Sequence, residues 1–260
     1  DLDKIFEEQL KRLRTDFIDF YLLHSLMRDS WKKVQELDIL GWAERQIAKG
    51  RIGYLGFSFH DELEVFREIV DAYDWSFCQI QYNYLDEHFQ AGKEGLKYAA
   101  SKGLAVVVME PLAGGLLAVN PSSQIREEWE KADSGRSSPD WALQWVWNQP
   151  EVSLALSGMN SKRQIDENIE SANHSGPNSL TPKELEILAK SRELFAECGY
   201  IGCTKCRYCI KCPQKVDIPL NLEFLNQYSA KRGDPEKQNA IKKRFKQTVP
   251  AKHRANNCVQ

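Results

Sequence analysis

Five short apolar segments, separated by segments of helical periodicity, constrain the fold of this chain more than any other feature. The predicted strands are residues 17–23, 52–57, 77–82, 105–109 and 152–156. Helical segments between consecutive strands imply parallel strands, because parallel strands need long crossover connections. Residues 105–109 are apolar throughout, which is typical of a strand buried on both faces. The pattern therefore predicts an α/β fold, and it leaves open a doubly wound sheet and a βα barrel.

Apolar residues that recur every three or four positions predict the helices. These cover residues 2–13, 31–49, 63–72, 92–101, 141–147, 161–172, 181–197 and 220–228. We expect the long helix 31–49 to end at Gly50, since glycine commonly follows the last helical residue. The sequence changes in character after Asn178, and Thr181-Pro182 is a typical helix start. We therefore predict two domains, residues 1–178 and 179–260.

The charge balance and the apolar runs exclude several classes of protein. The 260 residues include 35 Lys and Arg and 37 Asp and Glu, which gives a formal net charge of −2. Neither a generally basic nucleic-acid-binding protein nor a protein attracted to anionic membranes is therefore expected. The apolar runs are far shorter than the roughly 20 residues that span a bilayer, and no apolar leader follows a charged N-terminal region. We expect a cytoplasmic protein whose partners include neither nucleic acid nor membrane.

Four of the seven cysteines form one run, Cys203, Cys206, Cys209 and Cys212, followed by Pro213. Cysteines at every third residue would cross-link almost nothing, so metal or cluster ligation in a reducing cytosol fits better than a disulfide framework. The run is close to the iron–sulfur spacing C-x₂-C-x₂-C-x₃-C-P, although its last gap holds two residues. A structural zinc is the alternative, and it usually takes two cysteine knuckles separated by a longer loop. The sequence predicts a 4Fe-4S cluster.

Two features of the C-terminal segment leave alternatives open. In two-cluster ferredoxins the cysteine before proline binds the other cluster. Cys212 could therefore bind the same cluster as Cys203, Cys206 and Cys209 or a second one. The segment beyond Ala230 contains nine Lys and Arg residues but only two acidic residues. We interpret this stretch as a solvated helix or linker, and the alternative is a docking surface for an acidic redox protein.

Polar residues stand at or near the ends of the predicted strands. They are His24, Ser58, Gln79, Glu110 and the pair Gly158 and Met159. A single histidine in an apolar setting is more often a packed core residue than a functional one. In a βα barrel, however, the C-terminal ends of the strands face the active site. These residues are candidates for an active site if the fold is a barrel.

Several stretches follow one another in the order of a known family. They are LKRLRTDFIDFYLLH (10–24), IGYLGFS (52–58), QIQYN (79–83), MEPLAGG (109–115), and SGMN (157–160) with Glu167-Asn168. Over roughly residues 1–175 they resemble the aldo-keto reductase family, and the first resembles its signature around the fourth barrel strand. The cysteine run resembles the ferredoxin-type extension of the iron–sulfur branch of that family. The resemblance implies a partial TIM (β/α)8 barrel, strands four to eight, followed by a small helical ferredoxin-like domain.

The resemblance also implies an activity, the NAD(P)H-dependent reduction of a small carbonyl substrate. The family uses an Asp, Tyr, Lys and His tetrad, in which Tyr donates the proton, and His24 matches the His. The other three lie on earlier strands, so we expect this chain alone to be inactive. Ser58 and Gln79 would hold the nicotinamide carboxamide. Further cofactor contacts are implied for Glu110, Gly158, Met159 and Gln164, and for Glu167 and Asn168 at the adenosine end.

Three positions depart from the pattern of the family. Phe59 stands where an Asn commonly follows the Ser, and Met109 stands where an aromatic ring often stacks on nicotinamide. Gln164 replaces an Arg that some members use near the adenosine 2′-phosphate, which leaves NADP(H) and NAD(H) both open.

The resemblance also bears on the extent of the chain. Five strands of an eight-stranded barrel would leave unpaired apolar edges, and Cys258 resembles the start of a second cysteine run. We expect a middle-to-late piece of a longer protein. The alternative function is a non-catalytic electron-transfer or binding module with a degenerate barrel and a structural iron–sulfur cluster.

Overall fold

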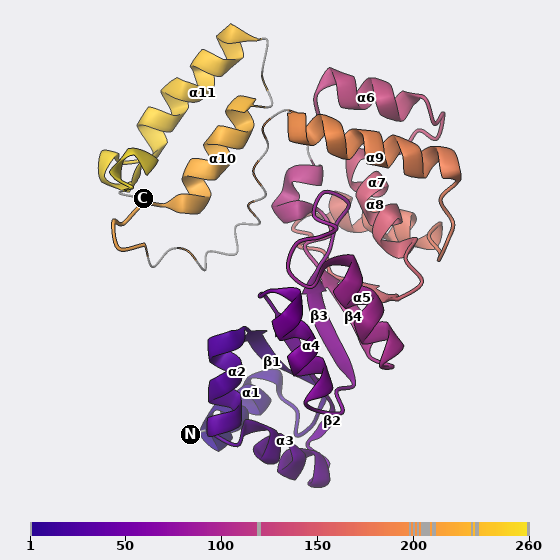
Figure 1. Cartoon of the computed structure of the whole chain (residues 1–260), viewed down its shortest axis with the longest axis vertical. Coiled ribbons are helices and arrows are strands. Elements are labelled where there is room, and N and C mark those ends of the chain that lie inside the picture. Colours follow the sequence, from indigo (N-terminus) through magenta and orange to yellow (C-terminus); the bar gives the residue numbers. More distant parts are fainter. Residues whose placement is uncertain are drawn as a thin grey trace. The chain divides into compact units, whose positions relative to one another are not determined.

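The computed structural model describes residues 2–118, 121–197, 199, 201, 203, 209, 212–229, 231 and 234–258. The chain forms two compact units, each drawn in Figure 1. The sheet unit comprises the residues up to Tyr82, Glu87–Met109 and Gln149–Leu156. The helical unit comprises Asn83–Asp86, Glu110–Asn148 and the residues from Ser157 onward.

The sheet unit contains five parallel strands that are adjacent in chain order. They are β1 (Ile18–Leu26), β2 (Ile52–Phe59), β3 (Phe77–Gln81), β4 (Ala105–Met109) and β5 (Val152–Ala155). A doubly wound sheet reverses its strand order at a switch point. No reversal occurs among these described strands, so the order favours the barrel-type alternative.

Helices cover one face of the sheet. They are α1 (Leu2–Leu13), α2 (Arg28–Glu36), α3 (Ile39–Ala48), α4 (Leu63–Asp71) and α5 (Gly92–Ser101). Figure 1 shows α4 and α5 running beside β3 and β4. Phe57 and Phe59 of β2 are fully buried, and their rings lie 5.9 and 5.0 Å from the ring of Phe66 on α4. Burial of these aromatic side chains, which typically contributes a few kcal/mol each, holds helices and sheet together.

The opposite face of the sheet is exposed and aromatic. Phe20, Tyr54 and Leu154 are 64%, 54% and 47% exposed. Phe20 and Tyr54 are partners in the β1–β2 register, and their rings stack 5.1 Å apart. The prediction that residues 105–109 are buried on both faces is wrong, because Ala105 is exposed and Val107 and Met109 are only half-buried. Successive side chains point to opposite faces, and the helices cover only one of them.

The helical unit is built on a buried tryptophan, Trp141. Its helices are α6 (Ser123–Glu130), α7 (Ser138–Trp147), α8 (Lys162–Asn173), α9 (Pro182–Glu197), α10 (Ile218–Ser229) and α11 (Pro235–Thr248), with short 3-10 turns at Ala113–Ala118, Ala251–His253 and Ala255–Asn257. The rings of Trp129 and Trp141 lie 6.1 Å apart, and Phe224 on α10 lies 5.4 Å from Phe245 on α11. None of the helices in the described part of the chain combines the length and apolarity that crossing a bilayer requires.

Three sequence predictions differ from the structure. The helix 31–49 is in fact two helices, α2 and α3, because Asp38 between them adopts a left-handed conformation with φ of 50°. Helix α6 was not predicted, since Ile125 and Trp129 are its only buried residues and one apolar pair gives little periodicity. Strand β1 continues to Leu26, so His24 lies inside the strand and not at its end. The other predicted strands and helices lie within a few residues of the observed ones.

The domain boundary at 178/179 remains a prediction. Helix α9, which the sequence placed in the C-terminal domain, contacts α6 within the helical unit. The indole N–H of Trp129 on α6 donates a hydrogen bond of 2.9 Å to the Ser191 hydroxyl on α9.

Candidate functional site

Strand register places Ser58 and Gln79 side by side in the sheet unit, because the two residues are partners in the β2–β3 ladder. Ser58 is buried, and its hydroxyl accepts a 2.7 Å hydrogen bond from the Ser25 N–H of β1. The hydroxyl proton of Ser58 remains available to a further acceptor. Gln79 is half-buried, and its amide group lies 3.5 Å from the Met109 sulfur on β4. Both side chains thus carry hydrogen-bonding groups on neighbouring strands, Ser58 next to the last residue of β2 and Gln79 in the middle of β3.

His24 is exposed and lies where the register between β1 and β2 shifts. A second histidine, His60, directly follows β2 and is half-buried. Burial lowers the pKa of His60 below 6.5, the charge of His24 lowers it further, and the Gln90 side chain opposes both effects. His60 was not among the predicted site residues, although its position two residues after Ser58 is a usable signal.

In the helical unit, Glu110 changes the direction of the chain directly after β4. Its backbone is left-handed, with φ of 57°, and its carbonyl accepts a 3.3 Å hydrogen bond from the amide of the buried Asn83. The side-chain oxygen Oδ1 of Asn83 in turn accepts the N–H groups of Leu85 and Asp86 at 3.0 and 3.1 Å. Asn83, the last residue of the QIQYN stretch, therefore fixes the backbone at Glu110.

The remaining predicted cofactor contacts lie in the loop before α8 and on α8 itself, where Glu167 and Asn168, predicted for the adenosine end, are mid-helix residues. Gly158 and Met159 precede the helix and are exposed. The Gln164 side chain is used in capping, since its oxygen accepts the Asn160 N–H at 2.9 Å. Asn168 donates to the Ser157 hydroxyl at 3.0 Å. These contacts fix the loop that leads into α8.

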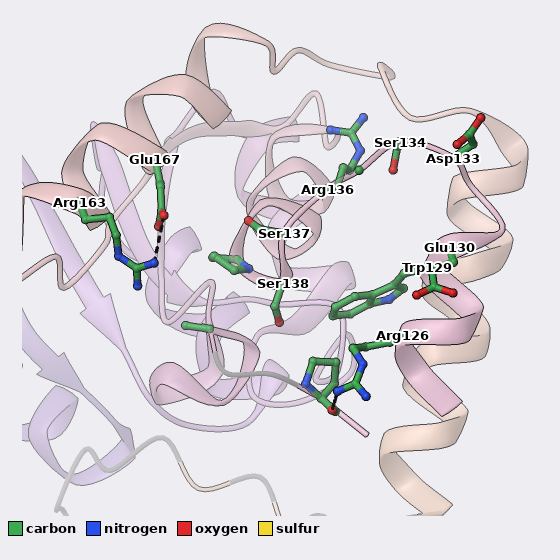
Figure 2. A pocket seen from close by; sticks show the side chains of 14 residues that line it. Arg126, Trp129, Glu130, Asp133, Ser134, Arg136, Ser137, Ser138, Arg163 and Glu167 are labelled. Atoms are coloured by element: carbon green, nitrogen blue, oxygen red, sulfur yellow. Dashed lines mark hydrogen bonds and ion pairs between the residues drawn. The ribbon is translucent and has the colours of Figure 1, made fainter. Parts of the chain in front are cut away.

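A cleft of about 780 Å³ lies within the helical unit (Figure 2). Its lining comprises Ala118, Pro121, Arg126, Trp129, Glu130, Asp133, Ser134, Gly135, Arg136, Ser137, Ser138, Pro139, Arg163 and Glu167. Figure 2 shows Arg163 and Glu167 on one side, joined by an ion pair of 3.4 Å, and Trp129 and Arg126 on the other. Of the predicted site residues, only Glu167 lines it.

The three arginines of the cleft have different surroundings. Arg136 is largely satisfied, because Nε and one terminal nitrogen lie 3.1 and 3.0 Å from Glu184 Oε1 and the other terminal nitrogen lies 3.3 Å from Asp140. The side chain of Arg163 is 81% exposed, and Arg126 is exposed and donates to the Pro121 carbonyl at 3.1 Å. Arg126 and Arg163 thus present exposed guanidinium groups to the cleft, and the Arg163 group is also ion-paired with Glu167.

The cleft also contains the start of α7. Ser137 caps this helix by accepting the Asp140 N–H, and Pro139 in its first turn has no N–H. The Trp141 N–H donates to the Ser137 carbonyl. The helix start therefore acts on an anion mainly through the helix dipole. Exposed guanidinium groups, a tryptophan and a helix dipole together suit an aromatic ligand that carries phosphates, although Glu130, Asp133 and Glu167 also line the cleft. The sequence analysis missed Arg126, Trp129, Arg136 and Arg163, which carry no local motif.

The cysteine run lies partly outside the described residues, because Cys206 is not among them. Cys203 and Cys212 are half-buried and Cys209 is exposed. No three metal-ligating side chains of the described residues lie close enough together to hold a metal ion.

Comparison with known proteins decides the family. Residues 1–191 match the sequence model of the aldo/keto reductase family. The chain belongs to the aldo/keto reductase family. An uncharacterized oxidoreductase of Bacillus subtilis, YrpG, is 27% identical over 187 residues, which are 63% of this chain and 56% of that protein. L-galactose dehydrogenase of Arabidopsis thaliana is 24% identical over 210 residues, 75% of this chain and 61% of that protein.

Solved structures of aldo-keto reductases have a similar fold. The holo form of one from Bacillus halodurans has a TM-score of 0.59 and 24% identity, and it matches over 73% of this chain and 64% of its own. One from Klebsiella pneumoniae, in complex with NADP and acetate, has a TM-score of 0.58 and 24% identity with the same coverage. The chain thus spans less than two thirds of the length of each of these relatives. It has the α/β, TIM-barrel-like aldo/keto reductase fold with a parallel sheet.

Proposed function

We propose that this aldo/keto reductase chain binds a nicotinamide dinucleotide and serves the reduction of a small carbonyl compound. The cleft of the helical unit carries this proposal, because its donor set suits the adenosine and phosphate portion of a dinucleotide. The Klebsiella pneumoniae relatives solved with NADP and with NADPH support this choice of cofactor. When bound, the reduced cofactor supplies a hydride to the carbonyl carbon.

Residues of the cleft would hold the adenosine end. Arg126 and Arg163 pair with phosphate oxygens, and the dipole at the start of α7 favours the same negative charge. Trp129 contributes an apolar wall against which a base can pack. Gln164 accepts the Asn160 N–H at the start of α8 and does not line the cleft.

The family resemblance assigns the contacts to the nicotinamide and the carbonyl to residues of the sheet unit. The Ser58 hydroxyl donates a hydrogen bond to the nicotinamide carboxamide, and the Gln79 amide pairs with the same group. His24 donates a hydrogen bond to the carbonyl oxygen, which becomes negatively charged as the hydride adds, and this contact strengthens as the charge develops. The tyrosine that protonates this oxygen in the family has no counterpart among the matched motifs of this chain.

Steady-state kinetics with NADPH, NADH and a panel of aldehydes tests this proposal. A general acid typically contributes 10²–10⁴-fold to the rate. We therefore expect the 260-residue chain by itself to show no turnover, and the chain extended by the family's first three strands to be active. In that longer protein His24→Ala should lower kcat more than it weakens cofactor binding. Ordinary turnover by the 260-residue chain, or equal kcat for His24→Ala and wild type, would contradict these assignments.

We further propose that the cysteine run binds an iron–sulfur cluster and that a redox protein exchanges electrons with it. This proposal is supported by the spacing of Cys203, Cys206, Cys209 and Cys212 in the sequence. The described cysteines do not form a group that could hold a metal ion. Lys242, Lys243 and Lys246 on α11 are exposed, which suits an acidic partner.

Iron and acid-labile sulfide analysis after anaerobic purification tests the cluster. A brown protein with both elements is expected. Stoichiometric zinc without labile sulfide after anaerobic reconstitution would show that the run is a zinc site.

A further inference from the structure

Helix α9 forms contacts with two residues that line the cleft, although no residue of α9 lines it. Glu184 on the first turn of α9 binds Arg136, with distances of 3.1 and 3.0 Å from its Oε1 to two guanidinium nitrogens. Two turns further along, the Ser191 hydroxyl accepts the indole N–H of Trp129 at 2.9 Å. Both contacts link segments far apart in sequence, which is the arrangement expected of a supporting element.

The position of Glu184 is itself fixed. Its second carboxylate oxygen accepts the Thr181 N–H and hydroxyl, each at 2.9 Å, while the Glu184 N–H donates to the Thr181 hydroxyl at 3.2 Å. This reciprocal pair is a capping box, and it satisfies backbone groups at the start of α9. The Glu184 and Arg136 side chains are only 11% and 21% exposed. A carboxylate held in this way fixes the guanidinium in one geometry, since both ion-pair partners have lost their freedom.

Ser191 is equally well placed. It is fully buried, and its own hydroxyl donates to the Ile187 carbonyl at 2.7 Å. With its proton engaged, the Ser191 oxygen is oriented as an acceptor for Trp129. The Trp129 ring thus has its orientation set by a hydrogen bond as well as by packing on Trp141.

We infer that Glu184 and Ser191 are positioning residues for the nucleotide cleft: α9 fixes the paired Arg136 side chain as part of the cleft wall and orients Trp129, against which the adenosine end of a dinucleotide packs. This inference rests on the proposed function, and it names residues that touch no ligand. A cleft with preset walls binds more tightly because less side-chain freedom is lost on binding. Removal of either contact therefore weakens binding without removing any group that touches the nucleotide.

Isothermal titration calorimetry of the full chain with NADP⁺ and NAD⁺ tests the inference, with each variant measured well below its melting temperature. We expect Glu184→Gln to weaken NADP⁺ binding about tenfold, and Ser191→Ala by a smaller factor, as losses of a charged and a neutral hydrogen bond imply. Glu193→Gln is the matched control, because Glu193 lies on the same helix in an exposed ion pair with Lys190. This control should bind like the wild type.

A double-mutant cycle separates positioning from general stabilisation. If Glu184 acts through Arg136, then Glu184→Gln should change the affinity little in an Arg136→Gln background. Ser191→Ala should also move the indole ¹H–¹⁵N signal of Trp129, assigned through Trp129→Phe. Wild-type affinity in both single variants, or an unchanged effect of Glu184→Gln in the Arg136→Gln background, would overturn the inference alone. A wild-type chain that binds neither nucleotide would overturn the proposed function and the inference with it.

Discussion

The strand-end residues of the sheet unit and the cleft of the helical unit are positioned by different forces. Ser58 and Gln79 are placed by backbone register, and their neighbours are backbone or apolar groups. Arg136 and Trp129 are placed by side-chain contacts to α9, about 50 to 60 residues further along the chain. Register follows from the apolar pattern, whereas the cleft depends on individual polar pairs. We therefore expect the cleft to be the more sensitive of the two to single polar substitutions.

The largest expected effect comes from the core beneath the cleft. Trp141 is fully buried, so Trp141→Ala should lower the free energy of unfolding by about 3–5 kcal/mol. Trp141→Phe should cost clearly less, because it keeps a ring and removes an indole N–H that has no acceptor among the described residues. Urea unfolding followed by circular dichroism measures both. Equal losses would show that the ring does not support this unit.

The exposed face of the sheet predicts self-association. Phe20 and Tyr54 form a stacked exposed pair, and a double Phe20→Ser, Tyr54→Ser variant should scatter less light at equal concentration than the wild type. Leu37→Ser is the control, since Leu37 is 68% exposed at the end of a helix. A monodisperse wild-type monomer would contradict the interpretation of this face.

Acid should weaken the Glu184 contacts. Burial raises the pKa of Glu184, but the hydrogen bonds from Thr181 and the Arg136 charge outweigh it and hold the pKa below 4.5. The unfolded state therefore binds this proton first as the pH falls, so the stabilisation is complete above 4.5 and is lost as the pH falls through the lowered pKa. Glu184→Gln should cost about 2 kcal/mol at pH 7. Chemical denaturation should show this difference shrinking in acid, and a pH-independent difference would contradict the ion pair.

The smallest expected effect concerns the histidine pair. The pKa of His60 lies below 6.5, so His60 is mainly neutral at pH 7. Loss of the His24 charge removes one of the causes, and His24→Gln should therefore raise the pKa of His60. Proton NMR titration of the imidazole signals measures it. An unchanged or lowered pKa would show that the two rings do not interact.

Elements with a regular apolar pattern could be predicted from the sequence, and features set by single residues could not. Helix α5 and strand β4 were predicted residue for residue, because their apolar periodicity is strong and glycine or a turn bounds them. Ser58 and Gln79 were singled out because they stand at or near the ends of predicted strands, which face the active site in a βα barrel, and because they match the family's motifs. The break at Asp38 was not predicted, since a single left-handed residue interrupts an otherwise helical pattern.

The cleft residues could not be predicted by this reasoning. Arg126, Arg136 and Arg163 stand alone in the sequence, and only the fold brings them to one cavity. Arg136 gains its geometry from Glu184, 48 residues away. No local periodicity encodes such a contact.

Hydrogen–deuterium exchange of the 260-residue chain with and without NADP⁺ tests the central claim, that the cleft of the helical unit receives the dinucleotide. The account predicts slower exchange on binding in residues 123–139 and 161–168, which contain the start of α7, Trp129 and Arg163. Residues of α10 and α11 should be unaffected. Protection that spares both cleft segments, with NADP⁺ bound, would contradict the account.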